Sequence, residues 1–289
     1  MRIQFTARLT TRPDRSKSGA ARIATGRLLL LSWEIYLILG ISALLRFLNI
    51  DKTIFDDDEA VVFQMAHDAV AHGLWPLTSN RASLGILNPP FVVYLFMIPS
   101  SLSANPLWGE VWVALFNTAA VLLTYCFTRR YYGRLAGTIT ALLYATSAGA
   151  WIYSRNIWPQ NFLPFFTLLL LICLFRGVVE RKKGWFCPAV VLIGILYQLH
   201  GSSIIVTIPL LFTTILLAFK TIRLRAVLLS IFALLLLFAP CIFWEFHSHF
   251  ADIKLLLSPT RQQASTDLQA LHFYLFFLHP TLINPYLSS

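Results

Sequence analysis

The chain has 289 residues, of which 57% are hydrophobic and only 12% are charged. Soluble domains carry about a quarter charged residues, so this composition excludes an ordinary water-soluble protein. The net charge is +10 at pH 7, but the basic residues stand in short clusters between apolar runs. Such clusters are typical of topology signals in membrane proteins, and they argue against a nucleic-acid partner.

Seven apolar segments are predicted to be transmembrane helices, since a spanning helix needs about 20 mostly apolar residues. They cover residues 28–48, 107–127, 135–153, 159–175, 185–199, 203–219 and 226–246. The predicted fold class is therefore an all-α polytopic membrane protein with a transmembrane domain over residues 28–246. Residues 1–27 are basic and polar and are predicted to form a cytoplasmic tail.

An eighth apolar segment, residues 91–103, is short and contains Pro99. If this segment does not cross and the N-terminus is cytoplasmic, 17 of the 23 Lys and Arg residues lie on the inner side. If it crossed, the basic clusters at 129–134 and 176–183 would move outside, against the positive-inside rule. We therefore predict an interfacial or re-entrant element within a long first outer loop, residues 49–105.

That loop contains four consecutive acidic residues, Asp56 to Glu59. The apolar residues after them recur at helical spacing, which predicts an amphipathic helix that lies on the membrane and ends at Gly73. Carboxylates at a helix start can serve as caps, but capping needs one or two, and four repel each other unless a cation or a proton offsets them. Capping and a catalytic or cation-binding role both stay open at this point.

Further residues complete a recognisable order. The first predicted helix ends in Leu45-Arg46-Phe47, and Asn88-Pro89-Pro90 with Tyr94 follows the acidic cluster. Later come Tyr153-Ser154-Arg155-Asn156 and Gln198-Leu199-His200-Gly201. Over residues 32–200 the chain resembles the GT-C membrane glycosyltransferases of the family 39/83 type, which include protein O-mannosyltransferases and lipid A aminoarabinose transferases.

The resemblance implies transfer of a sugar from a polyprenyl-phosphate donor to a lipid, glycan or protein acceptor. The reaction is expected on the periplasmic or extracellular face of the plasma (inner) membrane. Asp58 and Glu59 match the family's catalytic acidic pair, and Asp58 is also a candidate ligand for a divalent cation. The residues expected to bind substrate are Asp57, Arg81, Asn88, Tyr94, Arg155 and His200.

The sequence departs from the family pattern in two places. Many relatives carry Lys or His where this chain has Asn88, so Arg81 or Arg155 is expected to supply the missing charge for a phosphate. Relatives continue with more helices, so residues 247–289 are predicted to be an incomplete outer loop. Two alternatives therefore stay open: a non-catalytic or truncated relative, and a transporter of lipid-linked sugars, for which Glu34 is the main intramembrane charge.

Overall fold

The computed structural model describes residues 32–53, 55–82, 85–218 and 222–257. Every regular element of more than one residue in these ranges is helical, which confirms the predicted all-α class for the described residues. Most of the predicted cytoplasmic tail and outer C-terminal loop, 1–27 and 258–289, lies outside the described residues.

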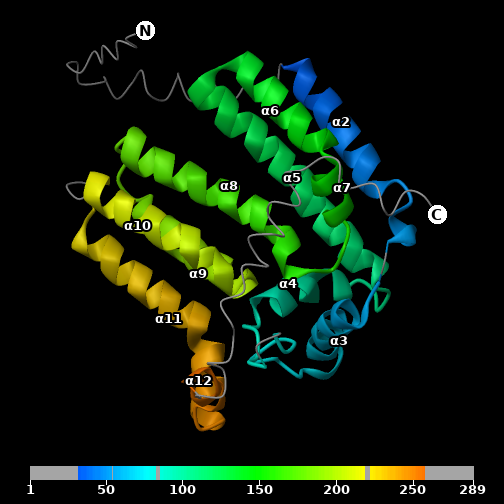
Figure 1. The fold of residues 1–289 in the computed structure, drawn as a ribbon, viewed down its shortest axis with the longest axis vertical. Helices are drawn as coiled ribbons and strands as arrows, with labels where there is room; N and C mark the ends of the chain where they lie inside the picture. The colour runs from blue at the N-terminus through cyan, green and yellow to red at the C-terminus, as the bar shows by residue number, and fades with distance from the viewer. Residues whose placement is uncertain (1–31, 54, 83–84, 219–221, 258–289) are drawn as a thin grey trace, which may run out of the picture.

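The helices run in the order of the chain (Figure 1). The first group is α2 (Trp33–Phe47), η1 (Ile50–Lys52), α3 (Asp57–His72), α4 (Phe91–Ser100), α5 (Leu107–Tyr132), α6 (Arg134–Thr146) and α7 (Ala148–Tyr153). The second is η2 (Pro159–Phe162), α8 (Leu163–Leu174), η3 (Phe175–Val179), α9 (Phe186–Leu199), η4 (Gly201–Ser203), α10 (Ile204–Ala218), α11 (Leu224–His247) and α12 (Ala251–Leu257).

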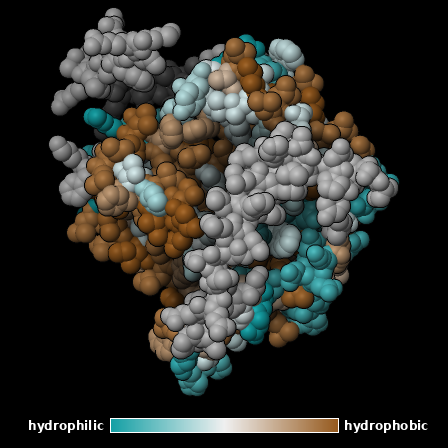
Figure 2. Space-filling view, in the orientation of Figure 1, coloured by the Kyte–Doolittle hydropathy of each residue, from teal (hydrophilic) through white to brown (hydrophobic). Residues whose placement is uncertain are grey.

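Three helical segments are long and apolar enough to cross a bilayer: Leu107–Tyr132, Pro159–Val179 and Leu224–His247. Shorter apolar helices occupy Phe91–Ser100, Phe186–Leu199 and Gly201–Leu217. The number of seven membrane crossings stays a prediction. Apolar side chains cover the surface over α8 to α11, whereas polar ones gather around α3 (Figure 2).

One end of the helix bundle is held together by ion pairs. The Arg134 guanidinium donates to both carboxylate oxygens of Glu34, over 2.6 and 2.8 Å. The Tyr125 hydroxyl also donates to Glu34 (2.8 Å), and Arg130 Nε donates to Glu180 over 2.6 Å. The start of α2 and the end of α5 therefore lie at the same end as the chain that follows α8. We call this the basic end.

The opposite end carries α3. The Thr53 hydroxyl, just after α2, donates to Glu110 Oε1 in the first turn of α5 over 2.5 Å. The chain between α2 and α5 thus leaves and returns at one end, which we call the α3 end. Its helix α4 has ten residues, about 15 Å at 1.5 Å per residue, or half the thickness of a hydrocarbon core. This geometry supports a segment 91–103 that does not cross.

The predicted single helix over residues 135–153 is divided in the structure. Ser147 adopts an extended conformation, with φ −60° and ψ 121°, between α6 and α7. The Thr146 hydroxyl donates back to the Leu142 carbonyl (2.9 Å), a bond that competes with regular helix continuation. The Trp151 indole N–H donates to the Leu45 carbonyl, which holds α7 against the end of α2.

Helix α3 buries the face that the apolar spacing predicts. Val62, Phe63 and Ala66 are buried in a core shared with Phe96 of α4. The helix ends at Gly73, whose φ of 68° suits glycine. Because this apolar face packs against protein, α3 is part of the folded domain and its first turn is rigidly placed.

Candidate functional site

The four acidic residues at the start of α3 separate into two environments. Asp56, Asp57 and Asp58 are exposed, whereas Glu59 is 3% exposed. Asp56 is the N-cap residue, but its side chain accepts no capping hydrogen bond. Capping by the Asp56 carboxylate, one of the two interpretations left open by the sequence, is therefore not what this helix start shows.

Glu59 points into the protein. Burial raises the pKa of its carboxyl to about 7; a hydrogen bond with the Asn156 side chain partly opposes that rise, and the negative charges of Asp56 and Glu110 add to it. Among the described residues its Oε2 has no hydrogen-bond partner. A carboxyl with this pKa exchanges its proton near neutral pH.

Glu110 is a site residue that sequence reasoning missed. It is 5% exposed and comes from the first turn of α5, beside Glu59. Oε1 accepts the Thr53 hydroxyl hydrogen bond, while Oε2 has no partner in the described part of the chain. The sequence signal was an acidic residue inside a predicted span, next to Gly109.

Arg155 lies at the same end of the bundle. Its Nη1 donates to the carbonyls of Leu48 (3.1 Å) and Asn49 (3.5 Å), and its guanidinium carbon lies 4.9 Å from the centroid of the Trp151 ring. A cation at these carbonyls complements the end of α2. The structure therefore gives Arg155 a role in holding the linker to α3, while its predicted contact with a substrate phosphate stays a prediction.

Asp58 is joined to a neighbouring turn by two amide side chains. Asn80 Nδ2 donates to Asp58 Oδ1 over 3.5 Å, and Asn88 Nδ2 donates to Asn80 Oδ1 over 3.2 Å. The backbone supports this arrangement, because the Ser79 N–H donates to the Asn88 carbonyl and the Asn88 N–H donates to the Asn80 carbonyl. We call this connection the amide link.

Asn88 also lines a cavity of about 290 Å³ at the α3 end. Such a volume is close to the lower limit for small-molecule sites. The turn before α4, the end of α9 and the end of α11 form its walls. Its polar lining residues are Thr78, Asn88, Gln198, His200, Glu245 and Asp252. We call this the outer cavity.

The remaining predicted residues divide between this cavity and its surroundings. His200 lines the outer cavity, and its Nδ1 lies 2.7 Å from the Ser202 hydroxyl. Arg81 donates to the Gly85 carbonyl (2.6 Å) inside the turn before α4, and Tyr94 donates to the Pro76 carbonyl (2.7 Å). Arg81 and Tyr94 therefore stabilise the turn that carries Asn88, and neither lines the outer cavity.

The side chains present do not by themselves form a metal centre. Within the described ranges, no three His, Cys, Asp or Glu residues are grouped as ligands for a metal ion. The divalent cation predicted at Asp58 therefore stays a separate prediction, and no chemical step is derived through it.

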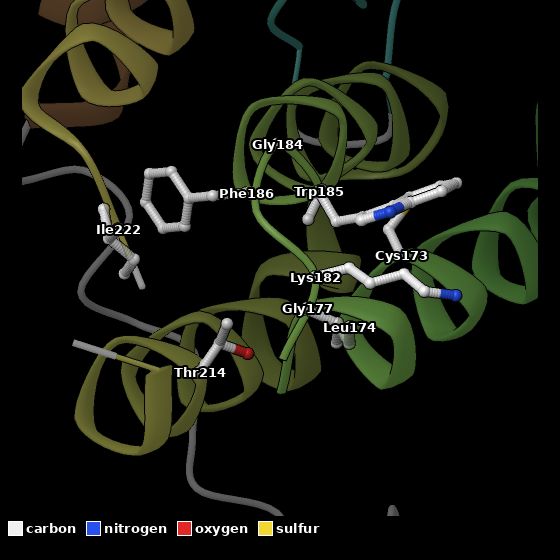
Figure 3. A pocket seen from close by; sticks show the side chains of 10 residues that line it. Cys173, Leu174, Gly177, Lys182, Gly184, Trp185, Phe186, Thr214 and Ile222 are labelled. Carbon is white, nitrogen blue, oxygen red and sulfur yellow. The ribbon is translucent and has the colours of Figure 1, made fainter. Parts of the chain in front are cut away.

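A further pocket lies at the basic end, among Cys173, Lys182, Trp185 and Thr214 (Figure 3). Its volume of about 20 Å³ suits about one water molecule. Lys182 forms an ion pair with Glu180. This pocket is too small for a sugar and far along the bundle from Asp58.

The matched sequence family decides the class of the protein. A family model described as dolichyl-phosphate-mannose-protein mannosyltransferase matches residues 87–244, more than half of the chain. The chain belongs to this family. It is a multi-pass membrane glycosyltransferase of the GT-C type. A search of curated proteins gives no match.

The matched region of this mannosyltransferase-family chain includes Asn88, Arg155 and His200, and it begins after Asp58 and Glu59. The family uses lipid-linked sugar donors. The roles assigned to individual side chains rest on the geometry above and stay predictions.

Proposed function

We propose that the protein transfers a sugar from a polyprenyl-phosphate donor to a lipid, glycan or protein acceptor at the α3 end of the bundle. One observation carries this proposal beyond family membership. The amide link connects exposed Asp58 with the outer cavity. A carboxylate beside a cavity of this size has the chemistry and the space that the reaction needs.

Asp58 is the proposed general base. It takes the proton from the acceptor hydroxyl or amine, the acceptor attacks the anomeric carbon, and the carbon–oxygen bond to the phosphate breaks. Polyprenyl phosphate leaves with the bonding electrons. A general base placed in this way contributes about 10²- to 10⁴-fold to a rate. Glu59 faces inward, so we assign it a positioning role through Asn156 and the Glu110 region.

The proposed orientation puts the α3 end outside and the basic end inside. It is supported by the clustering of Arg129, Arg130 and Arg134 at one end, which the positive-inside rule assigns to the cytoplasm. The proposed location is the plasma (inner) membrane, with the site on the periplasmic or extracellular face.

The transporter alternative gains no support from the described residues. Its main motivation was Glu34, which is ion-paired with Arg134 at the basic end instead of standing near the middle of the bundle. The alternative of a non-catalytic relative is separated by assay.

The test is sugar transfer from a polyprenyl-phosphate sugar in purified membranes. Asp58→Asn is expected to lower the transfer rate by about 10²-fold or more. Asp68→Asn, on the same helix but outside the site, is the matched control and is expected to keep wild-type activity. Full activity of Asp58→Asn would reject the proposed base, and an inactive wild-type protein would favour the non-catalytic relative. Addition of EDTA in the same assay tests the predicted divalent cation.

A further inference from the structure

A second cavity, of about 480 Å³, lies nearer the middle of the bundle than the outer cavity. It lies between α5, the α6–α7 break and η2, and it is lined by Asn117, Tyr144, Gly149, Ala150, Tyr153, Trp158, Gln160, Asn161 and Pro164. Its volume falls within the range of ligand sites, and mostly apolar walls with a few polar groups are typical of them. We call it the α7 cavity.

A buried arginine lies beside this cavity. Arg46 of α2 is 0% exposed. Its Nη1 donates to the Ser42 hydroxyl (2.9 Å) and to the Ala145 carbonyl (3.1 Å). Within the described ranges its Nε and Nη2 have no hydrogen-bond partner, and it forms no ion pair.

The charge of Arg46 is therefore not neutralised by the described side chains. Arginine cannot discharge by losing its proton in a protein, and a buried charge without a counter-charge is strongly destabilising. Two free donor nitrogens on one guanidinium suit a phosphate, which arginine binds through paired hydrogen bonds.

Tyr144 connects Arg46 to the α7 cavity. The Arg46 guanidinium carbon lies 5.9 Å from the centroid of the Tyr144 ring, and Tyr144 lines the cavity. The Tyr144 hydroxyl lies 3.5 Å from Asn117 Oδ1. Asn117 in turn donates to the Asn161 carbonyl over 2.9 Å. A fixed polar floor thus lies next to an unneutralised positive charge.

The cavity lining also includes aromatic residues that reach the molecular surface. Tyr153 is 61% exposed and Trp158 is 38% exposed. Aromatic side chains of this kind favour the level where a bilayer meets water. A ligand with a charged head and an apolar tail fits a polar floor with such walls better than an inorganic ion does.

We propose that the α7 cavity binds an isoprenoid lipid phosphate, with Arg46 as the counter-charge of the phosphate and the tail running out past Trp158. That this lipid is the carrier released by transfer rests on the proposed function. The binding site itself does not, because binding is measured without any transfer reaction.

The test measures binding to the purified full chain in detergent, by native mass spectrometry, with farnesyl phosphate, farnesol and inorganic phosphate as separate ligands. Wild-type protein is expected to prefer farnesyl phosphate to farnesol. Arg46→Gln is expected to lose about tenfold or more in affinity for farnesyl phosphate only, and Arg46→Lys is expected to keep part of it. Arg176→Gln is the matched control, since Arg176 also lies over an aromatic ring, Trp185, but at the basic end.

A cavity-filling variant keeps the test independent of the buried arginine. A Cβ at Gly149 would meet nothing within 4 Å, so Gly149→Leu is expected to fold and to weaken farnesyl phosphate binding by about tenfold. Wild-type binding by Gly149→Leu would overturn the proposal, as would inorganic phosphate that competes equally with the lipid. If Asp58→Asn abolishes transfer but binds farnesyl phosphate normally, base and lipid site are shown to be separate.

Discussion

At the scale of single residues, the site depends on the contrast between adjacent Asp58 and Glu59. Asp58 is exposed and linked through amides to the outer cavity, whereas Glu59 is buried near Glu110. The two carboxyls cannot perform the same task, because one reaches substrate and the other reaches the interior. The contrast follows from helix geometry, since neighbouring positions on α3 point about 100° apart.

The raised pKa of Glu59 makes the stability of the protein depend on pH. Because its pKa rises from 4.5 to about 7 on folding, the folded state holds the proton more tightly. The stabilising contribution is therefore complete below pH 4.5 and is lost as pH rises through 7, with a magnitude of up to about 3 kcal/mol.

Glu59→Gln should remove this dependence. Thermal unfolding of the detergent-solubilised protein between pH 4.5 and 7.5 is expected to show a wild-type melting temperature that falls with pH and a nearly flat profile for Glu59→Gln. Asp57→Asn, which changes an exposed neighbour, should follow the wild type. Parallel profiles for all three proteins would contradict a Glu59 that titrates in this range.

Part of this residue-scale picture could be predicted from the sequence. The acidic cluster was found because four carboxylates in succession are unusual at a helix start. The inward turn of Glu59 was not, because it depends on Asn156 and Ile157, about a hundred positions later in the chain. Glu110 was passed over because hydropathy assigned its whole segment to a membrane span.

At the scale of elements, the close approach of α3 and α5 fixes the start of α3. A Cβ on Gly109 would lie 2.8 Å from Ile157 Cδ1 and 3.0 Å from two ring atoms of Phe63. These distances leave no room for a side chain. Glycine is therefore the residue that lets α5 pack directly under the helix that carries Asp58 and Glu59.

Gly109→Ala is expected to destabilise the fold by about 1–3 kcal/mol, as overpacking of a dense core does, and to lower transfer activity by shifting α3. Chemical unfolding and the transfer assay measure the two effects. Gly40→Ala is the matched control, because a Cβ there meets nothing within 4 Å and alanine favours the helix. A Gly109→Ala protein as stable as wild type would show that Phe63 and Ile157 yield freely.

The helix boundaries show what the sequence pattern can predict. The end of α3 at Gly73 follows from the left-handed preference of glycine, and it was predicted correctly. The break at Ser147 was missed because apolar composition continues through it. That break depends on the bond from Trp151 to Leu45 of another helix, and a local pattern cannot contain such a contact.

At the scale of the whole molecule, the protein has two chemically different ends. The basic end joins Glu34 to Arg134, and the α3 end joins Thr53 to Glu110. The charge pattern predicted which segments share an end, because loops of like charge are sorted to one side of a membrane. It could not predict the cavities, which arise where several helices meet.

The proposed orientation is tested by cysteine labelling of intact cells in a background without native cysteines. Ser101→Cys, after α4, should react with an impermeant maleimide added from outside, since Ser101 is exposed and follows the α3-end helix. Lys183→Cys, exposed at the basic end, should react only after permeabilisation. The reverse pattern would invert the topology, and labelling of both from one side would mean that α4 crosses.

The amide link has a consequence for how the enzyme meets a changing environment. Asn80 and Asn88 carry no charge at any pH, so acidification of the surroundings leaves the connection between Asp58 and the outer cavity in place. A lysine or histidine at position 88 would instead place a charge there, constant for lysine and lost above neutral pH for histidine. The asparagine thus separates the arrangement of the site from its proton chemistry, which leaves acidity to act through carboxyls alone.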